Sequence, residues 1–168
     1  MAEIINVFKE LMPDVKLIGK RYSNEDRDSF GSFSSKWGEW FQNGYFEKLK
    51  QCEGIEKISD DYVGAMRCVD GRFEYWIGIF MSPNDEAPED FEAINIDSSQ
   101  LGVCYVYGNE NNGDIYGMEV HNACMEKFKE QNWIVSENNW FVERYNCPRF
   151  TTPDEKGNVI LDYCAYLG

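Results

Sequence analysis

The chain has 168 residues, of which 43% are hydrophobic and 15% aromatic, and this composition predicts a single folded domain over residues 1–168 with a substantial core. Its 30 acidic residues outnumber the 16 Lys and Arg, and the net charge of −14 disfavours direct nucleic-acid binding while it tolerates or attracts neutral and cationic ligands. Because no segment reaches membrane-spanning length and the N-terminus does not resemble a signal peptide, we expect a cytoplasmic protein without a membrane partner.

The first strands are expected near the N-terminus, at residues 4–8 and 15–22. Both stretches are apolar or rich in branched residues, and Met12-Pro13 predicts a bend between them, since proline interrupts regular strand pairing. A helical N-terminus is the competing interpretation.

A helix carrying several large rings is expected next. Ser34 or Ser35 supplies an N-cap, and the apolar residues that follow have the spacing of three and four that marks one helix face. Asn43-Gly44 predicts a break into two helices. The apolar positions are Trp37, Trp40, Phe41, Tyr45, Phe46 and Leu49.

A hairpin is expected to complete the first half. After a loop through Gly54, residues 62–69 and 73–80 have the composition of strands, and Asp70-Gly71 between them is the strongest hairpin motif in the chain. The first half therefore reads as strand, helix, strand, strand.

The second half repeats this order after an acidic connector at residues 83–90. Predicted strands at residues 91–96 and 101–107 precede a helix whose apolar stripe has spacings of three and four, and two further strands follow at residues 140–146 and 159–166. The stripe consists of Ile115, Met118, His121, Met125 and Phe128. Two matching halves, at about residues 1–82 and 91–168, predict an α+β fold in which a duplicated β-α-β-β unit forms an antiparallel sheet with two main helices and a ligand groove between the halves.

Glu143 is the residue that this pattern makes conspicuous. In a strand over residues 140–146 it shares a face with Phe141 and Tyr145, so a carboxylate lies in the middle of an aromatic row, while Arg144 points to the other face. Burial among rings would raise its pKa by desolvation and suit it to recognise a cation or to transfer a proton. A solvated or structurally paired carboxylate is the alternative.

Three stretches of the sequence, in their order and spacing, resemble the gyrase-inhibitor-like small-molecule-binding domain family, which also forms the effector-binding half of multidrug-responsive transcription regulators. These are residues 74–78 (Glu-Tyr-Trp-Ile-Gly), residues 88–97 at the connector, and residues 141–145 (Phe-Val-Glu-Arg-Tyr). The resemblance implies an aromatic pocket between related halves, with Glu143 facing it and Tyr75 and Trp76 contributing from the matching strand. The chain departs from the family at residues 102–104 and at Phe128, positions that concern the shape of the pocket.

Each candidate has a structural alternative. Rings on the first helix are usually core residues, and Trp37 and Phe41 share a face that Trp40 does not. Tyr75 and Trp76 face opposite sides of a regular strand. His121 fits a core position better than a catalytic one, because no nucleophile motif accompanies it. The candidate ligand-binding residues are Glu143, Tyr75, Trp76, Trp37, Phe41, Trp40, Phe141, Tyr145 and Tyr105.

No metal or cofactor is expected. The six cysteines form no Cys-x-x-Cys pair, only one histidine is present, and the glycines between Gly108 and Gly117 lack a phosphate-binding pattern. We expect reduced thiols that behave as small buried hydrophobic groups. The cysteines are Cys52, Cys68, Cys104, Cys124, Cys147 and Cys164.

Three functions follow as hypotheses. The first is a binding module for a hydrophobic, cationic or polycyclic small molecule, used for effector sensing or sequestration; a regulator of this kind would need a separate DNA-binding protein partner. The second, implied by the resemblance, is a hydrolase of strained cyclopropane-bearing natural products with Glu143 as general base. The third is a protein inhibitor of DNA gyrase. The sequence leaves the oligomeric state open.

Overall fold

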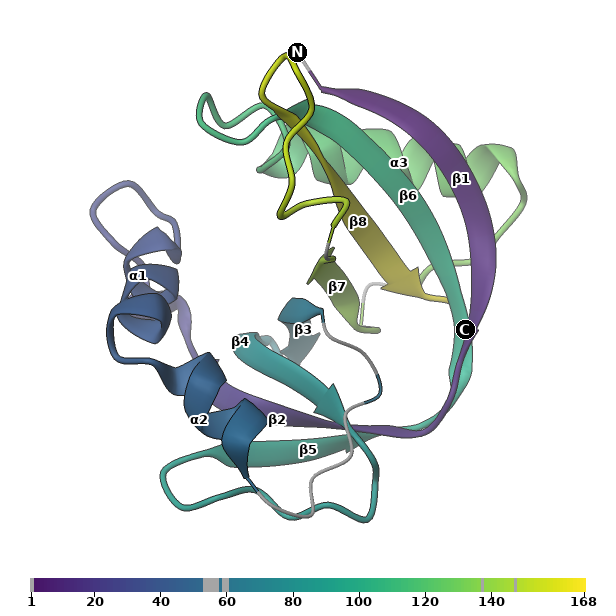
Figure 1. Cartoon of the computed structure of the whole chain (residues 1–168). Coiled ribbons are helices and arrows are strands. Elements are labelled where there is room, and N and C mark those ends of the chain that lie inside the picture. The colour runs from purple at the N-terminus through teal and green to yellow at the C-terminus, as the bar shows by residue number, and fades with distance from the viewer. Residues whose placement is uncertain (1, 53–57, 59–60, 137, 147) are drawn as a thin grey trace.

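The computed structural model describes residues 2–52, 58, 61–136, 138–146 and 148–168. The described chain is an α+β fold in which eight antiparallel strands form one curved sheet, with the order β1-β6-β8-β7-β3-β4-β2-β5 (Figure 1). The strands are β1 (Glu3–Met12), β2 (Val15–Tyr22), β3 (Tyr62–Val69), β4 (Arg72–Met81), β5 (Glu92–Ile96), β6 (Ser99–Asn109), β7 (Phe141–Tyr145) and β8 (Asn158–Tyr166). The helices are a short 3-10 turn, η1 (Asn24–Asp26), and α1 (Ser34–Gln42), α2 (Tyr45–Gln51) and α3 (Met118–Glu130).

The N-terminal segment is a strand, and the helical alternative is wrong. β1 is longer than the predicted residues 4–8 because it pairs with β6 from Glu3 to Met12, so backbone hydrogen bonds support it along its whole length. The chain then turns at residues 13–14, as the proline predicts, and continues as β2.

The break in the first helix is confirmed. Gly44 has a φ of 66°, a left-handed conformation that glycine adopts without steric cost, and it separates α1 from α2. The predicted cap is wrong: Phe33 occupies the N-cap position, and Ser34 and Ser35 lie within the helix. The hydroxyl of Ser32 instead accepts a hydrogen bond from the Ser34 N–H.

The hairpin between β3 and β4 is also confirmed. Asp70 and Gly71 have φ values of 52° and 76°, the conformation that a two-residue hairpin turn requires. The loop predicted through Gly54 lies outside the described residues.

The apolar stripe predicted for the second helix is partly wrong. Ile115 is buried but precedes α3, and Met118 at the first position of the helix is 70% exposed. The side chains that α3 buries are Val120, Cys124 and Phe128, because the helix starts only at residue 118 and turns a neighbouring face to the sheet. Within the described part of the chain, no helix is long and apolar enough to cross a membrane.

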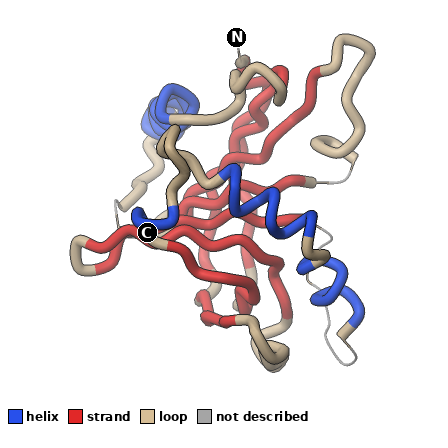
Figure 2. The backbone as a smooth tube through the Cα atoms, turned by 90° about the vertical axis from the view of Figure 1, so that its left-hand side faces the viewer, coloured by secondary structure: helices blue, strands red, loops and turns tan. Residues whose placement is uncertain are grey.

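The strand order confirms a duplicated β-α-β-β unit. In the first half the spatial order is β3-β4-β2, in the second it is β7-β8-β6, and β3 pairs with β7 at the centre. The outer strands are exchanged between halves, since β1 pairs with β6 and β5 pairs with β2. Figure 2 shows the strands in the middle of the molecule, with α1 and α2 on one side and α3 on the other.

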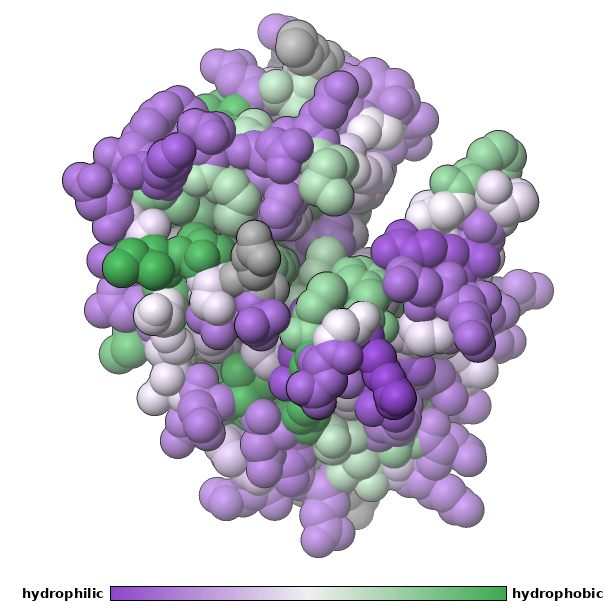
Figure 3. Space-filling model, turned by 180° about the vertical axis from the view of Figure 1, so that it is seen from behind, coloured by the Kyte–Doolittle hydropathy of each residue, from purple (hydrophilic) through white to green (hydrophobic). Residues whose placement is uncertain are grey.

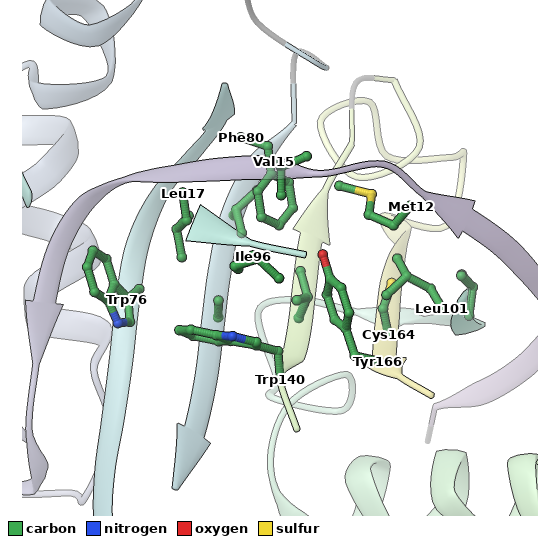
Figure 4. Close-up of a cluster of buried hydrophobic side chains, with 14 residues drawn as sticks. Met12, Val15, Leu17, Trp76, Phe80, Ile96, Leu101, Trp140, Cys164 and Tyr166 are labelled. Atoms are coloured by element: carbon green, nitrogen blue, oxygen red, sulfur yellow. The ribbon is translucent and has the colours of Figure 1, made fainter. Parts of the chain in front are cut away.

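The two faces of the central strands are buried against different clusters. Side chains from all eight strands converge on one face under the corner between β1 and β2, and Trp76, Trp140 and Tyr166 are among the residues of this cluster (Figure 4). On the other face, α1 and α2 cover the β2–β4 end and α3 covers the β6–β8 end. The space between these two helical layers lies above β3 and β7.

Candidate functional site

Glu143 lies at the seam between the two halves. It belongs to β7, where Gly64 of β3 is its neighbour on one side and Tyr163 of β8 on the other. Directly opposed residues of antiparallel strands share a face, and residues two apart on one strand do so too. Phe141 and Tyr145 therefore accompany Glu143 on the face that looks toward the helices, as the sequence pattern predicts.

Two tyrosine hydroxyl groups contact the Glu143 carboxylate. Tyr145 donates a hydrogen bond of 2.9 Å to one oxygen, and the Tyr75 hydroxyl lies 3.5 Å from the other, which is long for such a bond. Trp37 donates its indole N–H to the Tyr75 oxygen at 2.9 Å. An aromatic side chain from α1 is thus connected to the carboxylate through a single tyrosine.

Burial raises the pKa of Glu143 to about 7, and the hydrogen bonds from Tyr145 and Tyr75 offset part of that effect. Its side chain keeps intermediate exposure, because it opens into a cavity. Burial and the nearby Glu143 charge also raise the pKa of the Tyr75 and Tyr145 hydroxyls, so both remain proton donors at neutral pH. The carboxylate is therefore close to half-ionised at pH 7.

No cationic side chain neutralises Glu143 in the part of the chain that the structure describes. Arg144 points to the opposite face of β7, as predicted. There it forms two hydrogen bonds of 2.6 and 3.2 Å with Glu10, and its guanidinium lies 3.2 Å from Asp162. The positive charge next to Glu143 in the sequence is thus already paired on the other side of the sheet.

A cavity of about 1280 Å³ opens above Glu143, and both halves of the chain line it. It is larger than the 300 to 1,000 Å³ that is typical of small-molecule sites. Seen from behind, the molecule has a deep notch between the projecting segment on the right and the main body (Figure 3). The aromatic side chains of the lining are Phe33, Trp37, Phe41, Tyr62, Phe73, Tyr75, Tyr116, Phe141, Tyr145, Phe150 and Tyr163.

The structure brings six of the nine candidate residues together around this cavity. They come from α1, β4 and β7 and are Glu143, Tyr75, Trp37, Phe41, Phe141 and Tyr145. Phe41 is 59% exposed at its rim. Their role in ligand binding stays a prediction.

The other three candidates lie away from this cavity. Trp76 points to the opposite face from Tyr75 and belongs to the core under the β1–β2 corner. Trp40 is fully buried under α1, where its indole N–H donates to the Tyr22 hydroxyl at 3.0 Å. Tyr105 pairs with Asp162 and therefore shares the face of Arg144, with the Arg149 guanidinium 4.7 Å from its ring centre. Trp76 and Tyr105 point away from the cavity because successive side chains on a strand alternate between faces. Trp40 points away because of its position around the α1 helix.

Gly64 is a site residue that the sequence pattern did not reveal. A Cβ atom at this position would lie 2.8 Å from the Tyr75 hydroxyl and 3.1 Å from the Trp37 ring. The absence of a side chain therefore makes room for the two groups that cover Glu143. A glycine inside a predicted strand was the available indication, since it marks close approach of other atoms.

His121 lies at the cavity wall rather than wholly in the core. Its ring is partly buried, and its Nδ1 atom lies 2.5 Å from the Tyr163 hydroxyl. Burial lowers its pKa, so the ring is neutral at pH 7. The five described cysteines are free thiols, and Cys104, Cys124 and Cys164 are buried as predicted, whereas Cys68 is exposed. Cys147 lies outside the described residues.

Solved structures share this fold although their sequences differ widely. No protein-family model matches the sequence, and no curated protein sequence matches it. The structure of SAV2435 bound to tetraphenylphosphonium has a TM-score of 0.71 at 15% identity, over 98% of this chain and 94% of that one.

Two other solved structures also share this fold. A putative bacterial transcription regulation protein from Staphylococcus aureus has a TM-score of 0.64 at 16% identity, over 96% of this chain and 97% of that one. The C-terminal domain of EcmrR has a TM-score of 0.63 at 10% identity, with 97% of each chain covered. At these identities the likeness establishes the fold alone. It agrees with the family resemblance seen in the sequence, and membership of that family stays a prediction.

Proposed function

We propose that the cavity binds a hydrophobic aromatic cation and that Glu143 is its counter-charge. The observation that carries this proposal is a carboxylate, held by a tyrosine hydroxyl group in an aromatic cavity, that no described cationic residue pairs with. A bound cation would stabilise the ionised form of Glu143 and thereby offset the cost of its burial.

The cavity wall supports a ligand that is both aromatic and positively charged. The faces of Trp, Tyr and Phe rings attract cations, and each such contact is worth about 0.5 to 2 kcal/mol depending on how far it is desolvated. Contacts of this kind depend little on the detailed shape of the ligand. The cavity would therefore bind several different aromatic cations, as expected for effector sensing or for sequestration of toxic compounds.

A solved structure with a similar fold supports the proposal that the ligand is an aromatic cation. SAV2435 has this fold and was solved with tetraphenylphosphonium, a cation surrounded by four phenyl rings. The same compound is a suitable probe for this chain, because it carries charge and aromatic surface but no hydrogen-bonding group.

The test is a calorimetric titration of tetraphenylphosphonium at pH 8 into the wild type and Glu143→Gln. We expect the variant to bind at least about tenfold more weakly, because the amide keeps the shape of the carboxylate but lacks its charge. Glu126→Gln is the matched control, since Glu126 is exposed on α3 and its loss changes the net charge equally. Equal affinity of wild type and Glu143→Gln would refute the proposal.

The near-neutral pKa of Glu143 supports hydrolysis as a second candidate function. A general base works best when its pKa is close to the working pH, and tyrosine hydroxyls can orient water or substrate. Glu143 would take a proton from water while the water oxygen bonds to a cyclopropane carbon and a strained ring bond breaks. The electron pair of that bond would pass to the electron-withdrawing group of the ligand, which would then take up the proton from Glu143. Mass spectrometry of electrophilic cyclopropanes incubated with wild type and Glu143→Gln tests this function. A hydrated product formed by the wild type alone would support it, and no product with either protein would refute it.

A further inference from the structure

Arg27 forms a second charged position on the same cavity, at the end away from α3. It follows η1, and it lines the cavity together with Phe33 and Phe73. Its guanidinium carbon lies 4.7 Å from the Phe33 ring centre and 4.9 Å from that of Phe73. The Arg27 side chain thus packs against Phe33 and Phe73, which line the same cavity as Glu143.

Local hydrogen bonds hold this guanidinium in place and leave part of it free. Its Nε donates to the Asn24 side chain at 2.9 Å, and its Nη1 donates to the Gly31 carbonyl at 2.7 Å. Across the described residues, Nη2 has no hydrogen-bond partner. Arginine presents its donors in a planar fork that suits carboxylate, sulfonate and phosphate groups.

Among the residues that the structure describes, Arg27 also has no ion-pair partner, although acidic residues flank it. Asp26 accepts hydrogen bonds from Ser23, and Asp28 accepts them from Ser32 and from the Phe30 N–H, so both carboxylates are turned into their own loop. The other arginine of the cavity lining, Arg67, is paired with Glu74 at 3.0 Å. In the described part of the lining, Arg27 is therefore the arginine whose charge is not balanced by a nearby carboxylate.

Stacked rings connect the two unbalanced charges. Phe33 beneath Arg27 stacks on Tyr75 with ring centres 4.2 Å apart and planes 3° from parallel, and the Tyr75 hydroxyl reaches Glu143. We propose that the cavity is bipolar and takes a flat aromatic zwitterion, whose cationic group lies at Glu143 and whose anionic group is held by Arg27. This inference rests on the proposed function for its cationic end only.

The test uses two dyes that share one aromatic cation and differ in a single charge. Rhodamine B carries a free carboxylate, whereas rhodamine B ethyl ester does not. Fluorescence anisotropy would follow their binding to the wild type, Arg27→Gln and Arg27→Lys. We expect Arg27→Gln to weaken binding of the zwitterion about five- to tenfold and binding of the ester less than twofold, with partial recovery in Arg27→Lys.

Two further variants distinguish a failure of the anionic subsite at Arg27 from a failure of cation binding at Glu143. Arg21→Gln removes the same charge from an exposed residue that does not line the cavity, and it should leave both dyes unaffected. Glu143→Gln should weaken both dyes, which tests the proposed function independently. If Arg27→Gln weakens the two dyes equally or not at all, or if the wild type binds only the ester, the anionic subsite is refuted. If the wild type binds neither dye but does bind tetraphenylphosphonium, the zwitterion site is refuted and the proposed function stands. If it binds none of the three compounds, both are refuted.

Discussion

Gly64 of β3 lies directly opposite Glu143 of β7, and the Tyr75 hydroxyl occupies the space that a side chain at residue 64 would need. Tyr75 can reach Glu143 only because residue 64 has no side chain. The pair also joins the two halves of the sheet, since β3 and β7 are the central strands. The proposed role of Glu143 depends on this junction.

Gly64→Ala should weaken binding of tetraphenylphosphonium by at least about tenfold. The new Cβ would lie 2.8 Å from the Tyr75 hydroxyl, so Tyr75 and Trp37 must move away from Glu143. We also expect a loss of about 1 to 3 kcal/mol in unfolding free energy, the usual cost of overpacking. Gly38→Ala is the control, because Gly38 is an exposed helical residue with open space around it, and alanine there should stabilise the protein slightly. Normal binding by Gly64→Ala would contradict the arrangement described for Tyr75.

The affinity for tetraphenylphosphonium should rise by roughly eightfold to tenfold between pH 6 and pH 8. With a pKa of about 7, Glu143 is mostly protonated at pH 6 and mostly ionised at pH 8, and a cation binds the ionised form. Calorimetry at pH 7 in two buffers of different ionisation enthalpy should detect proton release on binding. Glu143→Gln should bind weakly at both pH values and release no proton. A pH-independent affinity in the wild type would show that Glu143 is not the counter-charge.

Glu143 should also make the unfolding free energy depend on pH, and this free energy should fall as pH rises, whereas cation affinity increases. The pKa of Glu143 is raised from its usual value of about 4.5 to about 7, so the folded state holds the proton more strongly than the unfolded state. Its contribution to stability is therefore complete below pH 4.5 and is lost as pH rises through 7, by roughly 3 kcal/mol. Urea unfolding of wild type and Glu143→Gln at pH 5 and pH 8 measures this loss as a difference between the two proteins. A difference that does not change with pH would argue against a buried, titrating carboxylate.

Tyr145→Phe should raise the pKa of Glu143 above 7, and Tyr75→Phe should raise it less. Each hydroxyl group stabilises the ionised carboxylate by donating a hydrogen bond, and the contact from Tyr145 is shorter, at 2.9 Å against 3.5 Å. NMR titration of the labelled Glu143 carboxyl carbon gives these values directly. Binding of the cation to Tyr145→Phe should be weaker at pH 7 and recover at higher pH. A reversed order of the two variants would mean that Tyr75 is the main donor.

Two tryptophans of α1 should behave differently when replaced. Trp37 lines the cavity, so Trp37→Phe should reduce cation binding, because it removes the indole N–H that positions Tyr75. Trp40 is fully buried and bonds Tyr22, so Trp40→Phe should cost about 1 to 3 kcal/mol of unfolding free energy and leave cation affinity within twofold. Calorimetry and urea unfolding on both variants check the contrast. Weaker cation binding by folded Trp40→Phe would place that residue in the site after all.

Local patterns in the sequence determined most of the secondary structure. Proline at residue 13, Asn43-Gly44 and Asp70-Gly71 act through backbone conformation, which depends on the residues themselves, and each marks a turn or break at the predicted place. Strand alternation likewise separated Glu143 from Arg144, because successive side chains on a strand always point to opposite faces. The expectation of an α+β fold with a repeated unit follows from these local patterns alone.

The tertiary structure decided which rings line the cavity. Trp37 and Trp40 are the same residue type and lie on one helix. Only the rotation of α1 against β4 directs Trp37 to the cavity and Trp40 to the core. Gly64 and Phe33 lie beside Tyr75, and Arg27 lies against Phe73, through contacts between segments distant in the sequence, which no local pattern encodes. The sequence by itself determined that Glu143 lies in an aromatic strand. Among the described residues no cation pairs with it, because the packing of whole strands places Arg144 on the other face of the sheet, against Glu10 and Asp162.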